Sequence, residues 1–197
     1  MLDRLETDLY KDMQSGLNRR DVLKYGLVGA LASATPLLFS EGAHAAGNSS
    51  WRARFRHAHT GESFNGVYRV GNKYLPEAFE RINHVLRDHR TGEAFPMDPH
   101  VLDIMSMIQR KAGARNPIEI YSGYRSPKTN NGLRRASSGV AKNSFHMYGQ
   151  ALDIHIDGYS TAKLRNIAKS LRAGGVGYYP RSSFIHVDTG TVRSWNG

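Results

Sequence analysis

The first 45 residues have the pattern of an export signal, and they limit how much of the 197-residue chain is left to fold. The pair Arg19-Arg20 precedes a weakly apolar stretch from Tyr25 to Phe39, and the small-x-small sequence Ala43-His44-Ala45 follows as a cleavage site. Paired arginines in this position are typical of twin-arginine export signals. The apolar stretch has 15 residues, which is fewer than the roughly 20 that a membrane-spanning helix needs.

We therefore predict that residues 1–45 are a twin-arginine-type signal peptide and that residues 46–197 form one domain. An uncleaved membrane anchor is the alternative for the N-terminal segment. Once the signal is removed, we expect the domain in the periplasm, as a monomer without stable insertion in the membrane.

The domain that remains is strongly basic and contains no cysteine. The whole chain has a formal charge of +10, and residues 46–197 hold 22 basic and 11 acidic side chains, which gives them a charge of +11. Nucleic acid, an anionic membrane surface and the bacterial wall are the polyanions that suit such a charge, and export favours the wall. Because cysteine is absent, any metal site must use His, Asp or Glu.

Apolar periodicity predicts helices early in the domain and short strands late in it. Proline in the first turn opens a helix from Leu75 to about His89, and Asp98-Pro99 opens a second helix that ends near Gly113. The other predicted elements are a hairpin-like entry at 49–74, strands at 118–121, 150–156, 175–179 and 183–188, a basic loop at 128–142 and a helix at 161–172. This order indicates an α+β domain with a small antiparallel sheet and flanking helices.

Two histidines and an aspartate form the pattern with the most chemical content. His146 and Asp153 lie in the segment Ser144-Phe-His-Met-Tyr-Gly-Gln-Ala-Leu-Asp153, and His186 follows 33 residues after the aspartate. Two imidazoles and a carboxylate can hold Zn²⁺ and leave its fourth position open for a water molecule. Bound to zinc, that water ionises near neutral pH. Each of the three residues taken alone would be weak support, because histidines and aspartates more often have structural or surface roles.

The order of these motifs resembles the zinc D-Ala-D-Ala carboxypeptidase and dipeptidase superfamily, which shares its fold with the hedgehog signalling domain. The resemblance rests on Ser122-Gly-Tyr-Arg-Ser126, on the segment with His146 and Asp153, and on the late strand with His186. It is closer to the exported murein endopeptidase K type, given the leader, the segment Leu86–Glu93 and the ending Asp188-Thr-Gly-x-x-Arg-x-Trp195. The resemblance implies Zn²⁺ on His146, Asp153 and His186.

The resemblance also implies that Arg125 lies beside the zinc, where a guanidinium can bind a substrate carboxylate or stabilise an oxyanion. The general base departs from the family pattern, because Ser183 stands where many relatives have an acid three residues before the last histidine. We predict that Asp188 is the catalytic base, with His155 as the alternative. A role for Asp188 in orienting a ligand histidine is an equal possibility.

Two other groups of side chains are interpreted as structural. His57 and His59 have strand spacing but no carboxylate at a suitable interval, so we interpret them as surface residues. Arg87 and His89 lie near a helix end, where cations interact with the last carbonyl groups and the helix dipole.

The predicted function is hydrolysis of peptide cross-links between peptidoglycan stem peptides by a zinc enzyme. A D-Ala-D-Ala carboxypeptidase and a non-catalytic wall-binding module are the alternatives, and the absence of an acid at Ser183 favours the second of these. The sequence leaves open whether the bond lies in a 4-3 or a 3-3 cross-link. Nucleic-acid binding has only the charge in its favour, because no RNA-recognition or helix-turn-helix pattern is present.

Overall fold

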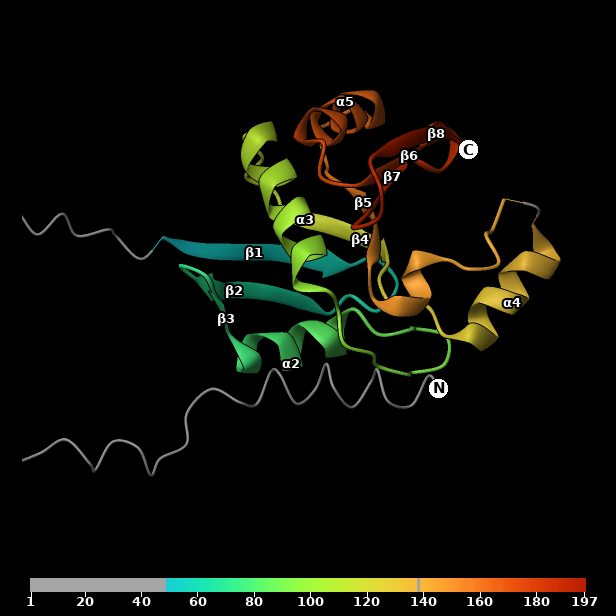
Figure 1. The fold of residues 1–197 in the computed structure, drawn as a ribbon, viewed down its shortest axis with the longest axis horizontal. Coiled ribbons are helices and arrows are strands. Elements are labelled where there is room, and N and C mark those ends of the chain that lie inside the picture. Colours follow the sequence, from blue (N-terminus) through green and yellow to red (C-terminus); the bar gives the residue numbers. More distant parts are fainter. Residues whose placement is uncertain (1–48, 138) are drawn as a thin grey trace, which may run out of the picture. The chain divides into compact units, whose positions relative to one another are not determined.

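A computed structural model describes residues 49–137 and 139–197, so the predicted signal peptide lies outside the described residues. One eight-stranded sheet has the order β3-β2-β1-β4-β5-β7-β6-β8 (Figure 1). The strands are β1 (Ser50–His57), β2 (Ser63–Val70), β3 (Lys73–Tyr74), β4 (Ile118–Ser122), β5 (Ala151–His155), β6 (Gly175–Tyr179), β7 (Phe184–Asp188) and β8 (Arg193–Asn196). The helices are α2 (Pro76–Val85), α3 (Pro99–Ala112), α4 (Pro127–Ala136) and α5 (Thr161–Leu171), with short 3-10 helices η2 (Phe145–Tyr148) and η3 (Pro180–Ser182).

The α+β class is confirmed, but the prediction of a small antiparallel sheet is wrong. The pairs β1–β4 and β6–β8 are parallel, and the remaining pairs are antiparallel. The predicted hairpin of β1 and β2 joins the main sheet because a long connection through α2 and α3 brings β4 alongside β1. Such a crossover is what parallel pairing requires, and a local sequence pattern does not reveal it. The hedgehog-type fold stays a prediction.

The predicted helix starts are confirmed, whereas the basic loop is largely helical. The side chain of Asp98 accepts a hydrogen bond from the backbone N–H of His100 at the start of α3, which ends at Gly113 with φ 66°. In the basic segment, Ser126 caps α4 through the N–H of Thr129. Apolar periodicity does not indicate this helix, because α4 buries only Thr129 and Asn130 and so has no apolar stripe. No helix in the described ranges is long and apolar enough to cross a bilayer.

The core lies on one face of the sheet, beneath α3 and α5, which pack against each other and against β7. Period-two alternation sets which side chains enter it. In β1 that alternation places His57 on the same face as Phe55, so His57 is fully buried. The prediction that His57 is a surface residue is therefore wrong. Burial lowers the pKa of His57 to about 4, with help from the neighbouring His89 and His59.

A buried carboxylate fixes the loop after β4. Asp88 is 2% exposed, and its Oδ2 accepts hydrogen bonds from the backbone N–H and the hydroxyl of Ser126, at 2.9 and 2.7 Å. Its Oδ1 accepts from the N–H of Arg90 at 2.9 Å. Burial alone would raise the pKa of Asp88, but the hydrogen bonds from Thr129, Ser126 and Arg90 outweigh it and bring the pKa to about 2. Arg125 directly precedes Ser126, so Asp88 also fixes the backbone that carries Arg125.

We expect Asp88→Asn to destabilise the domain most near neutral pH. The folded-state pKa of about 2 lies below the ordinary value of 3.8, so the carboxylate stabilises the fold above pH 3.8 and this contribution is lost as the pH falls through that interval. The loss at pH 7 should be about 2 kcal/mol. Urea unfolding of both proteins at pH 7 and at several values below pH 4 measures it. An equal decrease of stability with acid in the two proteins would contradict the assignment.

Candidate metal centre

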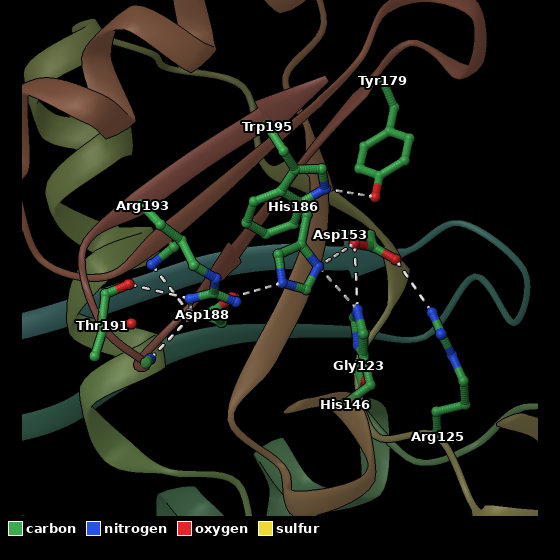
Figure 2. Close-up of polar contacts among 12 residues, drawn as sticks. Gly123, Arg125, His146, Asp153, Tyr179, His186, Asp188, Thr191, Arg193 and Trp195 are labelled. Carbon is green, nitrogen blue, oxygen red and sulfur yellow. Dashed lines mark hydrogen bonds and ion pairs between the residues drawn. The ribbon is translucent and has the colours of Figure 1, made fainter. Parts of the chain in front are cut away.

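Three side chains that are distant in the sequence converge at one point on the face of the sheet opposite the core (Figure 2). His146 comes from η2, Asp153 from β5 and His186 from β7, and all three are buried. Nε2 of His146 lies 3.2 Å from Nδ1 of His186 and 3.3 Å from Oδ1 of Asp153. Nδ1 of His186 lies 2.9 Å from the same oxygen. Among the described residues, this is the group of His and acidic side chains whose arrangement could hold a metal ion.

The pairing of β5 with β7 brings two of the three side chains together. Asp153 and His186 are directly opposite each other in this antiparallel pair, so their side chains leave the same face. Their neighbours in the strands point the other way: Leu152, Ile154, Ile185 and Val187 are fully buried in the core. The core residues therefore set the register that places the aspartate beside the histidine.

A tight turn brings His146 to the same point. Gly149 ends η2 with φ 66°, a left-handed conformation that glycine adopts without strain. A Cβ atom at this position would lie 2.2 Å from the carbonyl oxygen of Pro96. The chain can therefore reverse from His146 into β5 only because this residue has no side chain.

The second nitrogen of each imidazole is held by a hydrogen-bond acceptor. His146 Nδ1 lies 2.7 Å from the carbonyl oxygen of Gly123, and His186 Nε2 lies 3.0 Å from Oδ2 of Asp188. A carbonyl oxygen can only accept, and Asp188 is ionised, so each of these nitrogens carries the ring proton. The remaining nitrogen of each ring, Nε2 of His146 and Nδ1 of His186, faces Asp153 and is the atom that could bind a metal.

Two imidazole nitrogens and a carboxylate oxygen face one another in this buried site, an arrangement that suits a cation between them. Ligand atoms at about 2.0 to 2.1 Å from a tetrahedral Zn²⁺ are about 3.3 Å apart, and the three separations here are 2.9, 3.2 and 3.3 Å. The donor set is the nitrogen and oxygen combination that zinc accepts. These residues therefore fit a zinc ion.

The electrostatics of the three side chains keep the carboxylate ionised. Burial would raise the pKa of Asp153, but His146 and His186 outweigh that effect and lower it far below its usual value. Burial lowers the pKa of His146 and so keeps its imidazole neutral. Burial also acts to lower the pKa of His186, but hydrogen bonds to Asp153 and Asp188 outweigh it and raise the pKa.

Arg125 lies beside the three side chains, as the sequence predicted. Its Nη2 is 3.4 Å from Oδ2 of Asp153 and 3.3 Å from the hydroxyl of Ser122. The backbone N–H of Arg125 donates to the carbonyl oxygen of His146 at 3.1 Å. Burial lowers the pKa of Arg125, and the charge of Asp153 opposes this shift. The guanidinium is therefore a desolvated positive charge at the edge of the candidate metal site.

Asp188 is completely buried and its two oxygens are fully used. Oδ1 accepts from the N–H groups of Gly175 and Gly190, at 3.1 and 2.9 Å. Arg193 donates to both oxygens, at 3.0 and 2.7 Å, and His186 donates to Oδ2. Burial would raise the pKa of Asp188, but the hydrogen bonds from His186, Arg193 and Gly190 keep it well below its usual value.

His155, the alternative base, lies on the same face of β5 as Asp153 but outside the group of three. Its Nε2 is 3.3 Å from Oδ1 of Asp157, and its Nδ1 is buried without a hydrogen-bond partner among the described residues. The structure thus brings Arg125 and Asp188 into contact with the candidate ligands and leaves His155 farther along the strand.

Several groups that shape the site were not predicted as site residues. They are the carbonyl of Gly123, which orients His146, and the side chains of Tyr179, Arg193 and Trp195. Arg193 and Trp195 lie within the C-terminal motif, whereas Tyr179 belongs to no recognisable motif. A carbonyl group carries no residue-type signal, so the role of Gly123 could not be read from the sequence.

We expect Gly149→Ala to destabilise the domain by at least about 2 kcal/mol, because the substitution combines a strained backbone with a steric clash. Gly158→Ala is the matched control: its φ is 84° but a Cβ atom there meets nothing within 4 Å, so only the backbone strain of about 1 to 2 kcal/mol applies. Thermal unfolding of both variants measures the difference. Equal losses would show that the contact with Pro96 does not constrain the turn.

Comparisons with known proteins identify the family of this chain. A family model described as peptidoglycan L,D-endopeptidase MepK matches residues 45–195. The peptidoglycan L,D-endopeptidase MepK of Escherichia coli K12 is 47% identical over 137 residues, which are 70% of this chain and 75% of that protein. The probable peptidoglycan L,D-endopeptidase MepK of Haemophilus influenzae is 46% identical over 144 residues, 73% of this chain and 77% of that protein.

A solved structure, the L-Ala D-Glu endopeptidase ChiX of Serratia marcescens, aligns with 39% of this chain and 62% of its own length. The identity is 18% and the TM-score is 0.32, a likeness too low to add to the account of the fold. The family match covers almost the whole described domain, including every residue of the candidate site. The chain therefore belongs to the peptidoglycan L,D-endopeptidase MepK family.

Proposed function

We propose that this protein is a zinc-dependent endopeptidase that hydrolyses a peptide bond in the cross-links between peptidoglycan stem peptides. The observation that carries the proposal is the buried group of His146, Asp153 and His186, in which two imidazole nitrogens and a carboxylate oxygen lie within 3.3 Å of one another. Membership in the MepK family supports the substrate class, since its named relatives are peptidoglycan L,D-endopeptidases. Their name favours an L,D bond as the one that is cut.

The three candidate ligands and Arg125 would have different roles in the reaction. His146, Asp153 and His186 would hold the zinc through three positions and leave one open. Bound there, zinc lowers the pKa of a water molecule to about 7 and polarises the amide carbonyl. Arg125, with 12% of its side chain exposed, can bind a carboxylate of the stem peptide or the negative oxygen that develops during hydrolysis. Its desolvation strengthens either interaction.

Asp188 is better suited to orienting His186 than to accepting a proton from water. Its oxygens already accept hydrogen bonds from His186, Arg193, Gly175 and Gly190, and none of its surface is exposed. A carboxylate that holds the outer nitrogen of a ligand histidine sets both the tautomer and the direction of the ring. Of the two roles considered for Asp188, we therefore propose the orienting one.

The basic charge of residues 46–197 fits an anionic wall polymer as substrate. We propose that the protein reaches this substrate in the periplasm after twin-arginine export of the folded domain. A D-Ala-D-Ala carboxypeptidase is less well supported, because the named relatives are endopeptidases.

Digestion of purified peptidoglycan tests the proposed function. We expect residues 46–197 with Zn²⁺ to release muropeptide monomers from cross-linked dimers, and the masses of the fragments identify the bond. His146→Ala should bind no zinc in equilibrium dialysis and should leave the dimers intact. His84→Ala is the matched control, because this histidine lies on α2 with 65% of its side chain exposed, and its activity should equal that of the unchanged protein.

Two results would reject the proposal. One is cleavage by the unchanged protein that persists in a strong zinc chelator. The other is sedimentation of the protein with peptidoglycan without any change in the muropeptides, which would instead favour the wall-binding module.

Substitution of Asp188 separates its two possible roles. Loss of an outer partner of a metal-ligating histidine typically decreases metal affinity about 10- to 100-fold, so we expect Asp188→Asn to weaken zinc binding by that factor. At saturating zinc, kcat should recover to near the unchanged value. If Asp188 is the base, zinc affinity should be little changed and kcat should stay low at every zinc concentration. Circular dichroism checks that the variant remains folded.

A further inference from the structure

A tyrosine hydroxyl that belongs to none of the predicted site residues lies beside the candidate metal centre. Tyr179 is the last residue of β6, and its register partner is Phe184 of β7, on the face of the sheet that also carries His186. Figure 2 shows its hydroxyl directed toward Asp153, with Arg125 on the other side of that carboxylate. Tyr179 and Arg125 therefore flank the same part of the site.

The ring of Tyr179 is held on several sides. It stacks on Phe184 with ring centroids 4.6 Å apart and an interplanar angle of 17°. Gly177 and Gly197 contact it with their backbones, and a Cβ atom on either glycine would lie within 2.8 Å of the ring. Gly197 is fixed in turn by a 2.9 Å hydrogen bond from its N–H to the carbonyl oxygen of Tyr178. The hydroxyl is therefore preorganised.

Trp195 of β8 determines which hydrogen bonds the hydroxyl of Tyr179 can make. Nε1 of Trp195 donates to the hydroxyl oxygen of Tyr179 at 3.0 Å, and the Trp195 ring lies 5.3 Å from the ring of His186. An indole nitrogen can only donate, so this bond uses a lone pair of the tyrosine oxygen and leaves the O–H proton available. Within the described residues, no acceptor takes that proton. A fixed donor without an acceptor therefore faces the site.

We propose that Tyr179 is a catalytic residue that donates a hydrogen bond to the oxyanion formed during amide hydrolysis, and that Trp195 is its positioning residue. This inference rests on the proposed function. Water adds to the carbonyl carbon of the scissile amide, the C=O π bond breaks, and its electron pair moves to the carbonyl oxygen. Tyr179 donates to this oxygen and keeps its proton. When the C–N bond breaks, its electron pair goes to the nitrogen and the pair on the oxyanion re-forms the C=O bond. Both protons of the added water pass to the nitrogen, so the products are a carboxylate and an ammonium group.

Tyr179→Phe tests the proposal, because it removes the hydroxyl and retains the ring that stacks on Phe184. Loss of one preorganised oxyanion donor should decrease kcat about 100-fold. KM for a purified cross-linked muropeptide dimer should change little, and zinc content measured by atomic absorption should stay at that of the unchanged protein. Tyr178→Phe is the matched control: this ring lies under Arg165 and belongs to residues packed on the core, so its kcat should not change.

A binding measurement separates this role from a structural one. By titration calorimetry, a phosphinate analogue of an L,D dipeptide, which mimics the tetrahedral intermediate, should bind the zinc-loaded Tyr179→Phe variant about 100-fold more weakly. The cleaved peptide products should bind both proteins equally. Trp195→Phe, which keeps an aromatic ring but loses the N–H donor, should show a smaller decrease in both kcat and phosphinate affinity.

Each other outcome has a distinct meaning. If the unchanged protein cleaves dimers and Tyr179→Phe has the same kcat and phosphinate affinity, the inference is wrong while the proposed function stands. If Tyr179→Phe loses zinc, the tyrosine supports the metal site and does not act on the oxyanion. If the unchanged protein itself has no zinc-dependent cleavage, the proposed function fails before this test applies.

Discussion

The pairing of β5 with β7 is the interaction on which the rest of the site depends. Asp153 and His186 are direct partners in this pair, and the residues on either side of them, Leu152 and Val187 among others, are buried in the core. A shift of register by one residue would bury the ionised aspartate in the core and expose apolar side chains on the other face. Burial of apolar surface therefore stabilises the one register that also assembles the candidate metal centre. The same pair of strands therefore stabilises the domain through one face of the sheet and positions the candidate metal ligands on the other.

The buried polar groups of this site are arranged so that most of them have a partner. Arg193, two backbone N–H groups and His186 surround Asp188, and Asp188 in turn fixes the ring of His186. The carbonyl of Gly123 does the same for His146. In the part of the chain that the structure describes, the inner nitrogens of His146 and His186 and Oδ1 of Asp153 have only one another as partners. Partly satisfied polar clusters are costly inside a protein, and a cation is the group that would complete this one. The outer hydrogen bonds thus prepare the inner atoms for a metal.

Segments before β5 and after β7 add further groups around the site. Asp88 fixes Ser126, which both caps α4 and follows Arg125 in the chain, so one buried carboxylate connects the end of α2, the start of α4 and the guanidinium beside Asp153. At the opposite end of the chain, β8 adds to the sheet through β6 and brings Trp195 over Gly177. The match to the MepK family extends over both of these contributions, from residue 45 to residue 195.

The sequence alone specified the helix starts and the α+β class, because caps and apolar periodicity are local signals. It also pointed to His146 and Asp153 through one short segment, and to His186 through the order of the family motifs along the chain. The family was recognisable for the same reason, since its motifs occur in a fixed order along the chain. The tertiary structure alone decided that the sheet is mixed, that the basic segment forms α4 and that His57 is buried. It alone also brought the carbonyl of Gly123 to His146, and Tyr179 and Trp195 to the edge of the site. These features depend on which strands become neighbours and in what register. The pairing of strands is determined by the burial of apolar side chains from the whole domain, and no single stretch of residues specifies it.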